Sequence, residues 1–451
     1  GNGGRNGIGI DLATTSNIKT FTNSGAIIGN NKAGMLLASG STIQNFNNSG
    51  SIQGLELGIQ TSGTINTFTN DGLIKSTGSG DYSHGIWVNS SSNIQTFTNN
   101  GTIIGSTRGV YFETSSQTNT FINKGTIQGA QAIVLKPGIS IEKLTNTGTI
   151  KSTGNVNPGA FPKLSAGILL RQNASVKTFT NEGLISANYL GIVLGQATID
   201  NFTNKGTIEV TKTHGIGGAV SLLSVYGASS YIKTFTNEGV LKSNSQGIVA
   251  ETGNKIDTII NKGTIDASSN GLTFYTYNDG SSGNKVELGS IILEKGSSIK
   301  AGNNGINLDG TSNKPITVSG SIEVKDKASV SGNNAGIVIG SGKKVNAQIK
   351  ISGSVTGGAA GIVNEGTIGS SSSEDGNTGG IVVSGGSISS SNEEGSGIVN
   401  RGNGSIAGDI KVESGASIKG GITNTGSGSI TGNIVVEENS KLDSITNTST
   451  S

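Results

Sequence analysis

The side chains with the greatest capacity for chemistry in this sequence are its two histidines. His84 and His214 each precede a glycine, and Asp81 lies shortly before His84. An imidazole near a carboxylate can transfer protons, and any Ser–His–Asp set in this chain must use one of these histidines. Neither histidine accompanies a recognisable nucleophile motif. We therefore expect Asp81 and His84 to form a surface hydrogen bond rather than a catalytic pair.

Other kinds of enzyme site lack the residues that they require. Glycoside hydrolysis uses two neighbouring carboxylates, and the acidic residues here are sparse and form no aligned column. The two His–Gly pairs resemble a fragment of the polygalacturonase signature, but its NTD and DD carboxylates are missing. The absence of cysteine removes thiolate chemistry and cysteine-based metal sites. We predict a protein that is not an enzyme and uses no metal or cofactor, with a carbohydrate-active enzyme as the less favoured alternative.

Composition excludes two further classes of protein. Only 13% of the 451 residues are charged and the net charge is +2, so the chain has no basic surplus for binding nucleic acid. No apolar run approaches the roughly 20 residues that span a bilayer as a helix. Frequent Ile, Val and Leu with few charges argue against disorder. We expect a folded chain that is stabilised by packing and backbone pairing, without disulfides.

A phrase of the form TFTNxGxI recurs along the first part of the chain. Eight of the 11 phenylalanines occupy one position of it, and consecutive copies are 22 to 35 residues apart. The residues at this position are Phe21, Phe46, Phe68, Phe97, Phe121, Leu144, Phe179, Phe202, Phe235 and Ile259. A period in the twenties with insertions is typical of a solenoid, and short β-rich segments closed by Gly and Asn exclude helices. We predict an all-β fold, a parallel β-helix of about 16 rungs.

Stacked rungs place identical residues above one another, about 4.8 Å apart. The phrase therefore predicts internal ladders of Phe, Ile and Asn, in which each Asn amide bonds to the next. The predicted Asn ladder comprises Asn23, Asn48, Asn70, Asn99, Asn123, Asn146, Asn181, Asn204, Asn237 and Asn261. We expect the glycine two residues after each Asn to supply a positive φ at the corner.

We predict one continuous solenoid domain over residues 1–451, with a change of core chemistry near residue 280. Residues 1–280 carry the Phe and Asn ladder rungs, and residues 281–451 carry Gly- and Ser-rich aliphatic rungs. The later phrases GIVNEGTI (361–368) and GIVNRGNGSI (397–406) are predicted to keep the N-x-G element with an aliphatic residue in place of Phe. The last residues begin another copy of the motif without completing it, so we expect the chain to be part of a longer protein.

One outward-facing column of the predicted rungs is unusually apolar. In strands such as GIWV (85–88), alternation points the Ile inward and the next residue outward. This column and the loops beside it supply the candidate binding residues Leu36, Tyr82, Trp87, Tyr111, Val134, Phe161 and Leu169. If exposed, they form a contact strip whose aromatic rings can stack on sugars or anchor a protein. The alternative is that loops 75–84 and 151–166 fold over the strip and bury Trp87, Phe161 and Leu164.

The tandem TFTNxGxI and GIVNxGTI rungs, the lack of cysteine, the low charge and the abundant Ser, Thr, Asn and Gly resemble the passenger domain of a bacterial autotransporter (type V secretion). The resemblance covers essentially the whole chain and is nearest to surface adhesins of Campylobacter and Helicobacter relatives. It implies a right-handed β-helix that is exposed on the bacterial outer membrane or secreted. It also implies anchoring through a membrane β-barrel domain absent from this chain.

This resemblance implies an adhesin with a role in virulence, which attaches to a host-cell protein or glycan through its loops and apolar strip. A second possibility is that the rod associates with other copies of itself and causes bacterial aggregation or biofilm formation. The third is the carbohydrate-active enzyme, built on a β-helix with scattered carboxylates.

Overall fold

The computed structural model describes residues 7–155, 164–213, 215, 217–224, 229–277, 285–369 and 379–450. The chain forms two compact units, residues 1–214 (unit 1) and 215–451 (unit 2). Over the described residues every regular element is a β-strand, and the strands pair in parallel. The prediction of an all-β parallel solenoid is confirmed.

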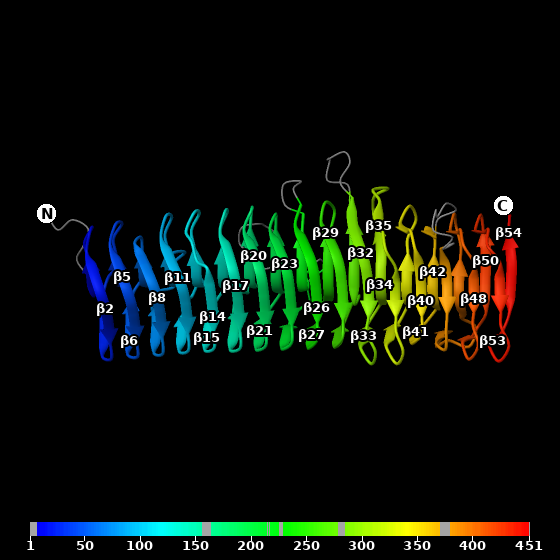
Figure 1. Ribbon diagram of the computed structural model, residues 1–451, viewed down its shortest axis with the longest axis horizontal. Coiled ribbons are helices and arrows are strands. Elements are labelled where there is room, and N and C mark those ends of the chain that lie inside the picture. The colour runs from blue at the N-terminus through cyan, green and yellow to red at the C-terminus, as the bar shows by residue number, and fades with distance from the viewer. Residues whose placement is uncertain are drawn as a thin grey trace. The chain divides into compact units, whose positions relative to one another are not determined.

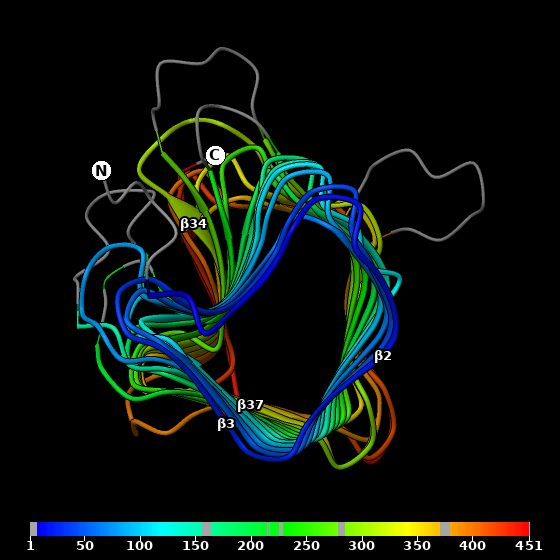
Figure 2. The ribbon, with the colours of Figure 1, turned by 90° about the vertical axis from the view of Figure 1, so that its left-hand side faces the viewer.

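Each rung of unit 1 contributes one strand to each of three parallel sheets, A, B and C (Figure 1). In the view along the stack, the blue and cyan rungs superpose, with β2 and β3 on different sides of the coil (Figure 2). Sheet A contains β1 (Ile10–Leu12), β4 (Ala33–Leu37), β7 (Leu57–Thr61), β10 (His84–Val88), β13 (Arg108–Phe112), β16 (Gln131–Leu135), β19 (Ala166–Arg171) and β22 (Leu190–Gly195).

The other two sheets of unit 1 follow sheet A along each rung. Sheet B contains β2 (Asn17–Asn23), β5 (Thr42–Asn48), β8 (Thr64–Asn70), β11 (Asn93–Asn99), β14 (Thr120–Asn123), β17 (Ser140–Asn146), β20 (Ser175–Asn181) and β23 (Thr198–Asn204). Sheet C contains β3 (Ala26–Gly29), β6 (Ser51–Gly54), β9 (Leu73–Ser76), β12 (Thr102–Ile104), β15 (Thr126–Gly129), β18 (Thr149–Ser152), β21 (Leu184–Ala187) and β24 (Thr207–Val210).

Unit 2 has the same plan with one change in sheet B. Its sheet A contains β25 (Gly218–Leu223), β28 (Gln246–Glu251), β31 (Leu272–Thr276), β34 (Asn304–Gly310), β38 (Ala335–Ile339), β42 (Ala360–Asn364), β46 (Ser396–Asn400), β50 (Ile422–Gly426) and β54 (Ile445–Ser449). In sheet B, β32 (Val286–Leu293) pairs with two short strands, β35 (Ile316–Val318) and β36 (Ile322–Val324). Sheet C has eight strands in each unit, in agreement with the predicted 16 rungs.

The interior of unit 1 is a stack of phenylalanines flanked by isoleucines. Phe46 and Phe68 lie with ring centroids 4.6 Å apart and planes within 5°, and Phe68 and Phe97 are 4.7 Å apart. These rings are fully buried, as are Ile43 and Ile65 in the same strands. Rung spacing therefore sets the ring spacing, and each Phe buries its faces against its own copies. The predicted Phe and Ile ladders are confirmed.

The corner asparagines form a continuous amide ladder in unit 1, and the next such pair, Asn237 and Asn261, lies in unit 2. In unit 1 the Nδ2 of each Asn donates to the Oδ1 of the Asn one rung further, for example Asn70 to Asn99 and Asn99 to Asn123, both at 2.8 Å. The second N–H of Asn99 reaches the Gly101 carbonyl at 3.2 Å. In unit 2, Asn237 donates to Asn261 at 2.8 Å. These amides are buried, and the ladder satisfies hydrogen-bonding groups that burial would otherwise make costly.

The predicted role of the corner glycine is wrong. None of the described glycines in the N-x-G corners of the Phe ladder has a positive φ. The requirement is instead close approach between rungs: a Cβ on Gly101 would lie 2.1 Å from the Gly72 carbonyl oxygen, and one on Gly72 would lie 2.0 Å from that of Gly50. From Gly50 onward in unit 1, each corner glycine is needed because the glycine carbonyl of the previous rung occupies the place of its side chain, whereas Gly25, in the first copy, has open space there.

The late N-x-G phrases are also placed differently from the prediction. Asn364, Asn400 and Asn424 lie at or near the ends of sheet A strands β42, β46 and β50, whereas the TFTN asparagines end sheet B strands. They form a second amide ladder, with Asn364 donating to Asn400 at 2.7 Å and Asn400 to Asn424 at 2.8 Å. The phrase GIVN is a sheet A strand that has gained its own Asn corner, and the aliphatic residue does not replace Phe.

We predict that Asn99→Ala destabilises the fold by about 2–4 kcal/mol, because it removes the acceptor of Asn70 and the donor to Asn123. The measurement is the midpoint of urea unfolding. The control is Thr98→Ala in the same strand, whose side chain is half-buried on the other face. Equal stability of the two variants would contradict a structural role for the ladder.

We predict that Gly101→Ala costs about 2–3 kcal/mol of unfolding free energy, since the new methyl group meets the Gly72 carbonyl and the rungs must separate. Gly25 occupies the same motif position but has no atom within 4 Å of a built Cβ, so Gly25→Ala is the matched control. Thermal unfolding of both variants tests this. A loss of similar size at Gly25 would point to backbone conformation instead of rung contact.

Candidate functional site

A bend at a glycine in most sheet A strands, with Ala132 at this position of β16, brings two columns of side chains together on the outside of unit 1. A Cβ on Gly85 would lie 2.7 Å from Cγ2 of Ile103, inside the coil, and one on Gly109 would lie 2.6 Å from Cγ2 of Ile127. The chain turns at this glycine, and the residue before it therefore packs on the outer face. There it meets the residue two places after the glycine, as His84 meets Trp87.

The cluster that results contains Tyr82, His84, Trp87, Arg108 and Tyr111, which we call the aromatic–cationic cluster. The Tyr82 ring stacks on Trp87 at 6.1 Å, and the His84 ring lies edge-on to Tyr111 at 5.2 Å. Trp87 and Tyr111 pair directly in neighbouring strands, with centroids 6.2 Å apart. The Arg108 guanidinium lies over the Tyr111 ring at 4.3 Å from its centroid, within the range of a cation–π interaction.

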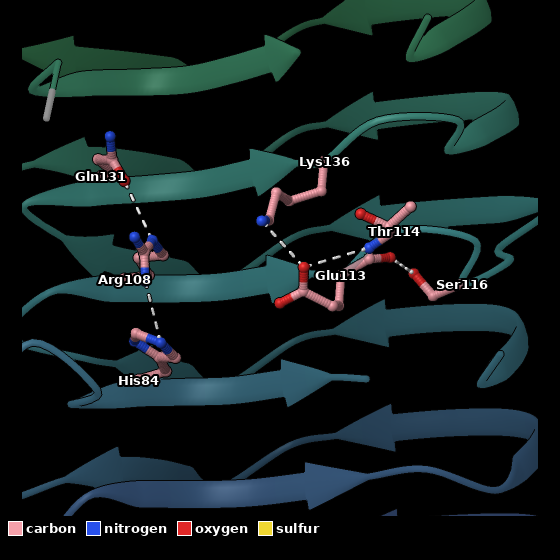
Figure 3. A network of polar contacts seen from close by, with 7 residues as sticks. All are labelled: His84, Arg108, Glu113, Thr114, Ser116, Gln131 and Lys136. Carbon is pink, nitrogen blue, oxygen red and sulfur yellow. Dashed lines mark hydrogen bonds and ion pairs between the residues drawn. The ribbon is translucent and has the colours of Figure 1, made fainter. Parts of the chain in front are cut away.

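Three polar side chains on successive rungs form a column through this cluster (Figure 3). Arg108 Nη1 lies 3.1 Å from His84 Nε2, and Arg108 Nε donates to Gln131 Oε1 at 3.1 Å. Gln131 Nε2 donates in turn to the Leu164 carbonyl at 2.7 Å. An arginine has only donors, so His84 Nε2 must be the acceptor and the imidazole must be neutral.

The electrostatics of the cluster agree with a neutral histidine beside a cation. Burial and the Arg108 charge lower the pKa of His84 to about 3, against a hydrogen bond to the Ser83 backbone that raises it. Burial also lowers the pKa of Arg108, which Arg171 lowers further and Tyr111, Glu113 and Asp81 raise. Burial, followed by the Glu113 carboxylate, raises the pKa of Tyr111. At neutral pH the cluster carries the Arg108 charge, with His84 and Tyr111 uncharged.

A second polar group lies at the other end of the same strands. Lys136 Nζ is 3.0 Å from Glu113 Oε1 and 5.8 Å from the Tyr111 centroid. Figure 3 shows this pair on neighbouring rungs, next to Thr114 and Ser116. Both charged side chains are partly exposed. Glu113, a carboxylate that acts on Arg108, is therefore already paired with Lys136.

The predicted exposure of the apolar strip is wrong for three of its six described members. Tyr111 is 7% exposed, Val134 2% and Leu169 1%, whereas Leu36 and Trp87 are half-buried and Tyr82 is 63% exposed. The bend at each glycine explains the difference, because the first residue of each strand folds over this column. The same packing recurs in unit 2, where Ala335 and Ala360 cover Val363.

The alternative that loops cover the strip is supported where the loops are described. Tyr82, from the loop before β10, lies on Trp87, and Leu164, before β19, is buried. Both loops connect sheet C to sheet A, as the insertions in the sequence predicted. Phe161 and His214 lie outside the described residues. His84 bonds to Arg108 and makes no hydrogen bond to Asp81, so the predicted pair of Asp81 and His84 is wrong.

The sequence reading missed Arg108 and Gln131. The signal in the sequence is the residue type at the position immediately before the bend. This position holds Ala33 and Leu57 in two rungs, and then His84, Arg108 and Gln131 in the next three. Three polar residues in consecutive copies of a usually apolar position mark a site, once that position is known to face outward.

Unit 2 contains two buried ionisable groups away from this cluster. Glu251, at the end of β28, is 4% exposed and accepts a hydrogen bond from the Ser224 backbone N–H at 2.9 Å. Burial raises its pKa to about 7, although the Ser224 and Tyr277 hydrogen bonds lower it. Lys343 is also buried, and its Nζ donates to Thr276 Oγ1 and to the Ser312 and Lys314 carbonyls at 2.8–2.9 Å. These acceptors account fully for the lysine as a structural cross-link.

Comparison with protein-family models, curated proteins and solved structures finds no match. Within the described part of the chain no helix is long and apolar enough to cross a membrane. In the same part, no three His, Asp or Glu side chains are grouped so that they could hold a metal ion. The fold and the site together define a parallel β-helix solenoid with one aromatic–cationic cluster on the outer face of unit 1.

We predict that Glu251→Gln stabilises the protein at alkaline pH. The pKa of about 7 in the folded state exceeds the ordinary value of 4.5, so the stability linked to the protonated acid is complete below pH 4.5 and is lost as the pH rises through 7. The gain at pH 8 is at most about 3 kcal/mol, at roughly 1.4 kcal/mol per pKa unit.

The measurement is urea unfolding at pH 4 and pH 8. Wild type and Glu251→Gln should be similar at the lower pH and diverge at the higher one. Glu438→Gln, at an exposed carboxylate, is the control and should show no such divergence.

Proposed function

We propose that this chain is a surface-displayed adhesin, a passenger-type β-helix that attaches to host cells through the aromatic–cationic cluster. The observation that carries the proposal is the exposed Tyr82 ring, stacked on Trp87 beside the Arg108 guanidinium. Aromatic rings and arginine are the side chains that contribute most to binding at protein surfaces. The proposed location is the bacterial cell surface or the medium around it, with anchoring by a domain outside this chain.

The ladders support a role in display. Backbone pairing between rungs and the buried amide ladder hold unit 1 in one register without disulfides. Side chains on such a frame have fixed spacing, so Trp87 and Tyr111 keep their relation without the cost of ordering a flexible loop. A rigid scaffold that carries a few exposed anchors is typical of binding rather than of catalysis.

The alternatives remain self-association and carbohydrate-active catalysis. Burial of Tyr111, Val134 and Leu169 removes most of the apolar surface on which lateral association was predicted. His84 is a weak base because of its low pKa, and its Nε2 is engaged by Arg108. Both observations favour the adhesin.

We predict that Tyr82→Ala weakens attachment of the purified, labelled chain to epithelial cells roughly tenfold or more, because the substitution removes an exposed anchor. Tyr82 is chosen over Tyr111 since its exposed ring contributes little to the core. Saturation binding to cultured cells, with circular dichroism to establish folding, provides the measurement.

The matched control is Tyr275→Ala in unit 2, which should bind as wild type does. Unchanged attachment of Tyr82→Ala would overturn the assignment of the site. If wild type does not attach to cells at all, concentration-dependent sedimentation would favour self-association, and release of reducing sugar from polysaccharides would favour the enzyme.

A further inference from the structure

Arg108 is a half-buried cation that makes no hydrogen bond or ion pair with a carboxylate among the described residues, although the Glu113 and Asp81 carboxylates are close enough to raise its pKa. Its two hydrogen-bond partners, His84 Nε2 and Gln131 Oε1, are both uncharged. Two other cations have carboxylate partners, Lys136 with Glu113 at 3.0 Å and Arg401 with Glu365 at 2.7 Å, and the buried Lys343 is held by three neutral oxygens. Removing a charge from water without pairing it is unfavourable, and a protein that retains such a group is prepared for an anion.

The neighbours of Arg108 fix the guanidinium and leave part of it unused. Nε and one N–H of Nη1 are engaged, and the plane lies over Tyr111, which leaves three of the five N–H groups without a partner in the described part of the chain. An arginine held in this way presents two parallel N–H groups, the geometry that fits a carboxylate. The neutral His84 adds no competing positive charge.

The surrounding charges also favour an anion. Lys136 lies over the far side of Tyr111, and Arg171 is close enough to lower the pKa of Arg108. The carboxylates within range are Glu113, which is paired with Lys136, and Asp81. In a chain whose net charge is only +2, two cations over one ring, with Arg171 close enough to act on Arg108, place positive charge at this part of the surface.

The aromatic side chains beside Arg108 suit a sugar ring. Tyr82 exposes its ring and lies on Trp87, and Trp87 is 6.2 Å from the Tyr111 ring over which the guanidinium lies. The Trp87 Nε1 is buried and finds no acceptor among the described residues. When a bound sugar shifts Tyr82 enough to open this N–H, a sugar hydroxyl can accept from the indole while the sugar ring stays in contact with Tyr82 and Trp87.

We infer that the aromatic–cationic cluster binds a sugar that carries a carboxylate, with the carboxylate on Arg108 and the sugar ring against Tyr82 and Trp87. This inference rests on the proposed function, because it names the chemical class of ligand at the same site. A neutral sugar would leave the guanidinium unpaired, and a simple anion would leave the aromatic platform unused.

The experiment uses the intrinsic fluorescence of Trp87, the only tryptophan in the chain. The full chain is titrated with glucuronate, with glucose, which differs only in lacking the C6 carboxylate, and with inorganic phosphate. We expect a saturable change with glucuronate in the millimolar range, at least tenfold weaker binding of glucose and of phosphate, and weakening by added salt. Equal binding of glucose would overturn the role of the carboxylate, and equal binding of phosphate would overturn that of the sugar.

Variants then assign the charge to its residue. Arg108→Gln should reduce glucuronate affinity at least tenfold, whereas Arg401→Gln, at the ion-paired arginine of unit 2, should leave it unchanged. Arg108→Lys keeps the charge but loses the forked geometry; we expect an intermediate loss, which also serves as the test if circular dichroism shows that Arg108→Gln is misfolded. Wild-type affinity in every folded Arg108 variant would refute the inference.

A parallel assay on cells separates this inference from the proposed function. Attachment that depends on Tyr82 but is the same for Arg108→Gln, and is not inhibited by glucuronate, would leave the adhesin standing and reject the acidic sugar. Glucuronate binding without attachment to cells would support the acidic-sugar ligand and reject the adhesin.

Discussion

The hydrogen bond from each corner amide to the amide of the next rung is the interaction on which this structure depends. It requires a buried Asn at the same place in every rung, and it requires the rungs to be separated by the reach of one N–H···O bond. Asn70, Asn99 and Asn123 meet both conditions at 2.8 Å. Once this spacing is set, the phenylalanines are stacked at van der Waals distance and the isoleucines of neighbouring strands are in register. Loss of a single member therefore affects two neighbours, unlike the loss of an isolated polar side chain.

Two close contacts then shape the rung, and each involves a glycine. One is between two backbones, and the other is between a backbone and a side chain. At the corner, Gly101 has no room for a Cβ because the Gly72 carbonyl lies beneath it. In sheet A, Gly85 has none because Ile103 fills that space from the opposite sheet. The second contact has a functional consequence, since the bend that it permits carries His84 to the outer face beside Trp87. The site is thus a product of the same packing that builds the core.

What distinguishes the aromatic–cationic cluster from the rest of the outer face is its charge. Further along unit 1 this column holds the buried apolar residues Val134, Leu169 and Val193. Around β10 and β13 the chain instead buries much of a guanidinium against tyrosine and neutral histidine. Such an arrangement costs stability, because a charge is partly removed from water without a directly paired carboxylate.

The sequence by itself determined the solenoid, its rung number and its internal ladders, because these depend on residues that repeat at fixed positions and stack on their own copies. Only the tertiary structure decided which side of the coil each position faces. Tyr111 was expected to be exposed and is buried, because of the bend at Gly85. The same bend brings His84 next to Arg108, although the linear pattern placed these residues in separate loops and strands. The tertiary structure also decided that the glycine of the corner serves close contact and not a positive φ, and that GIVN belongs to sheet A. Periodicity records which residues are equivalent, whereas exposure and pairing depend on backbone direction at each corner, and no residue type encodes that direction alone.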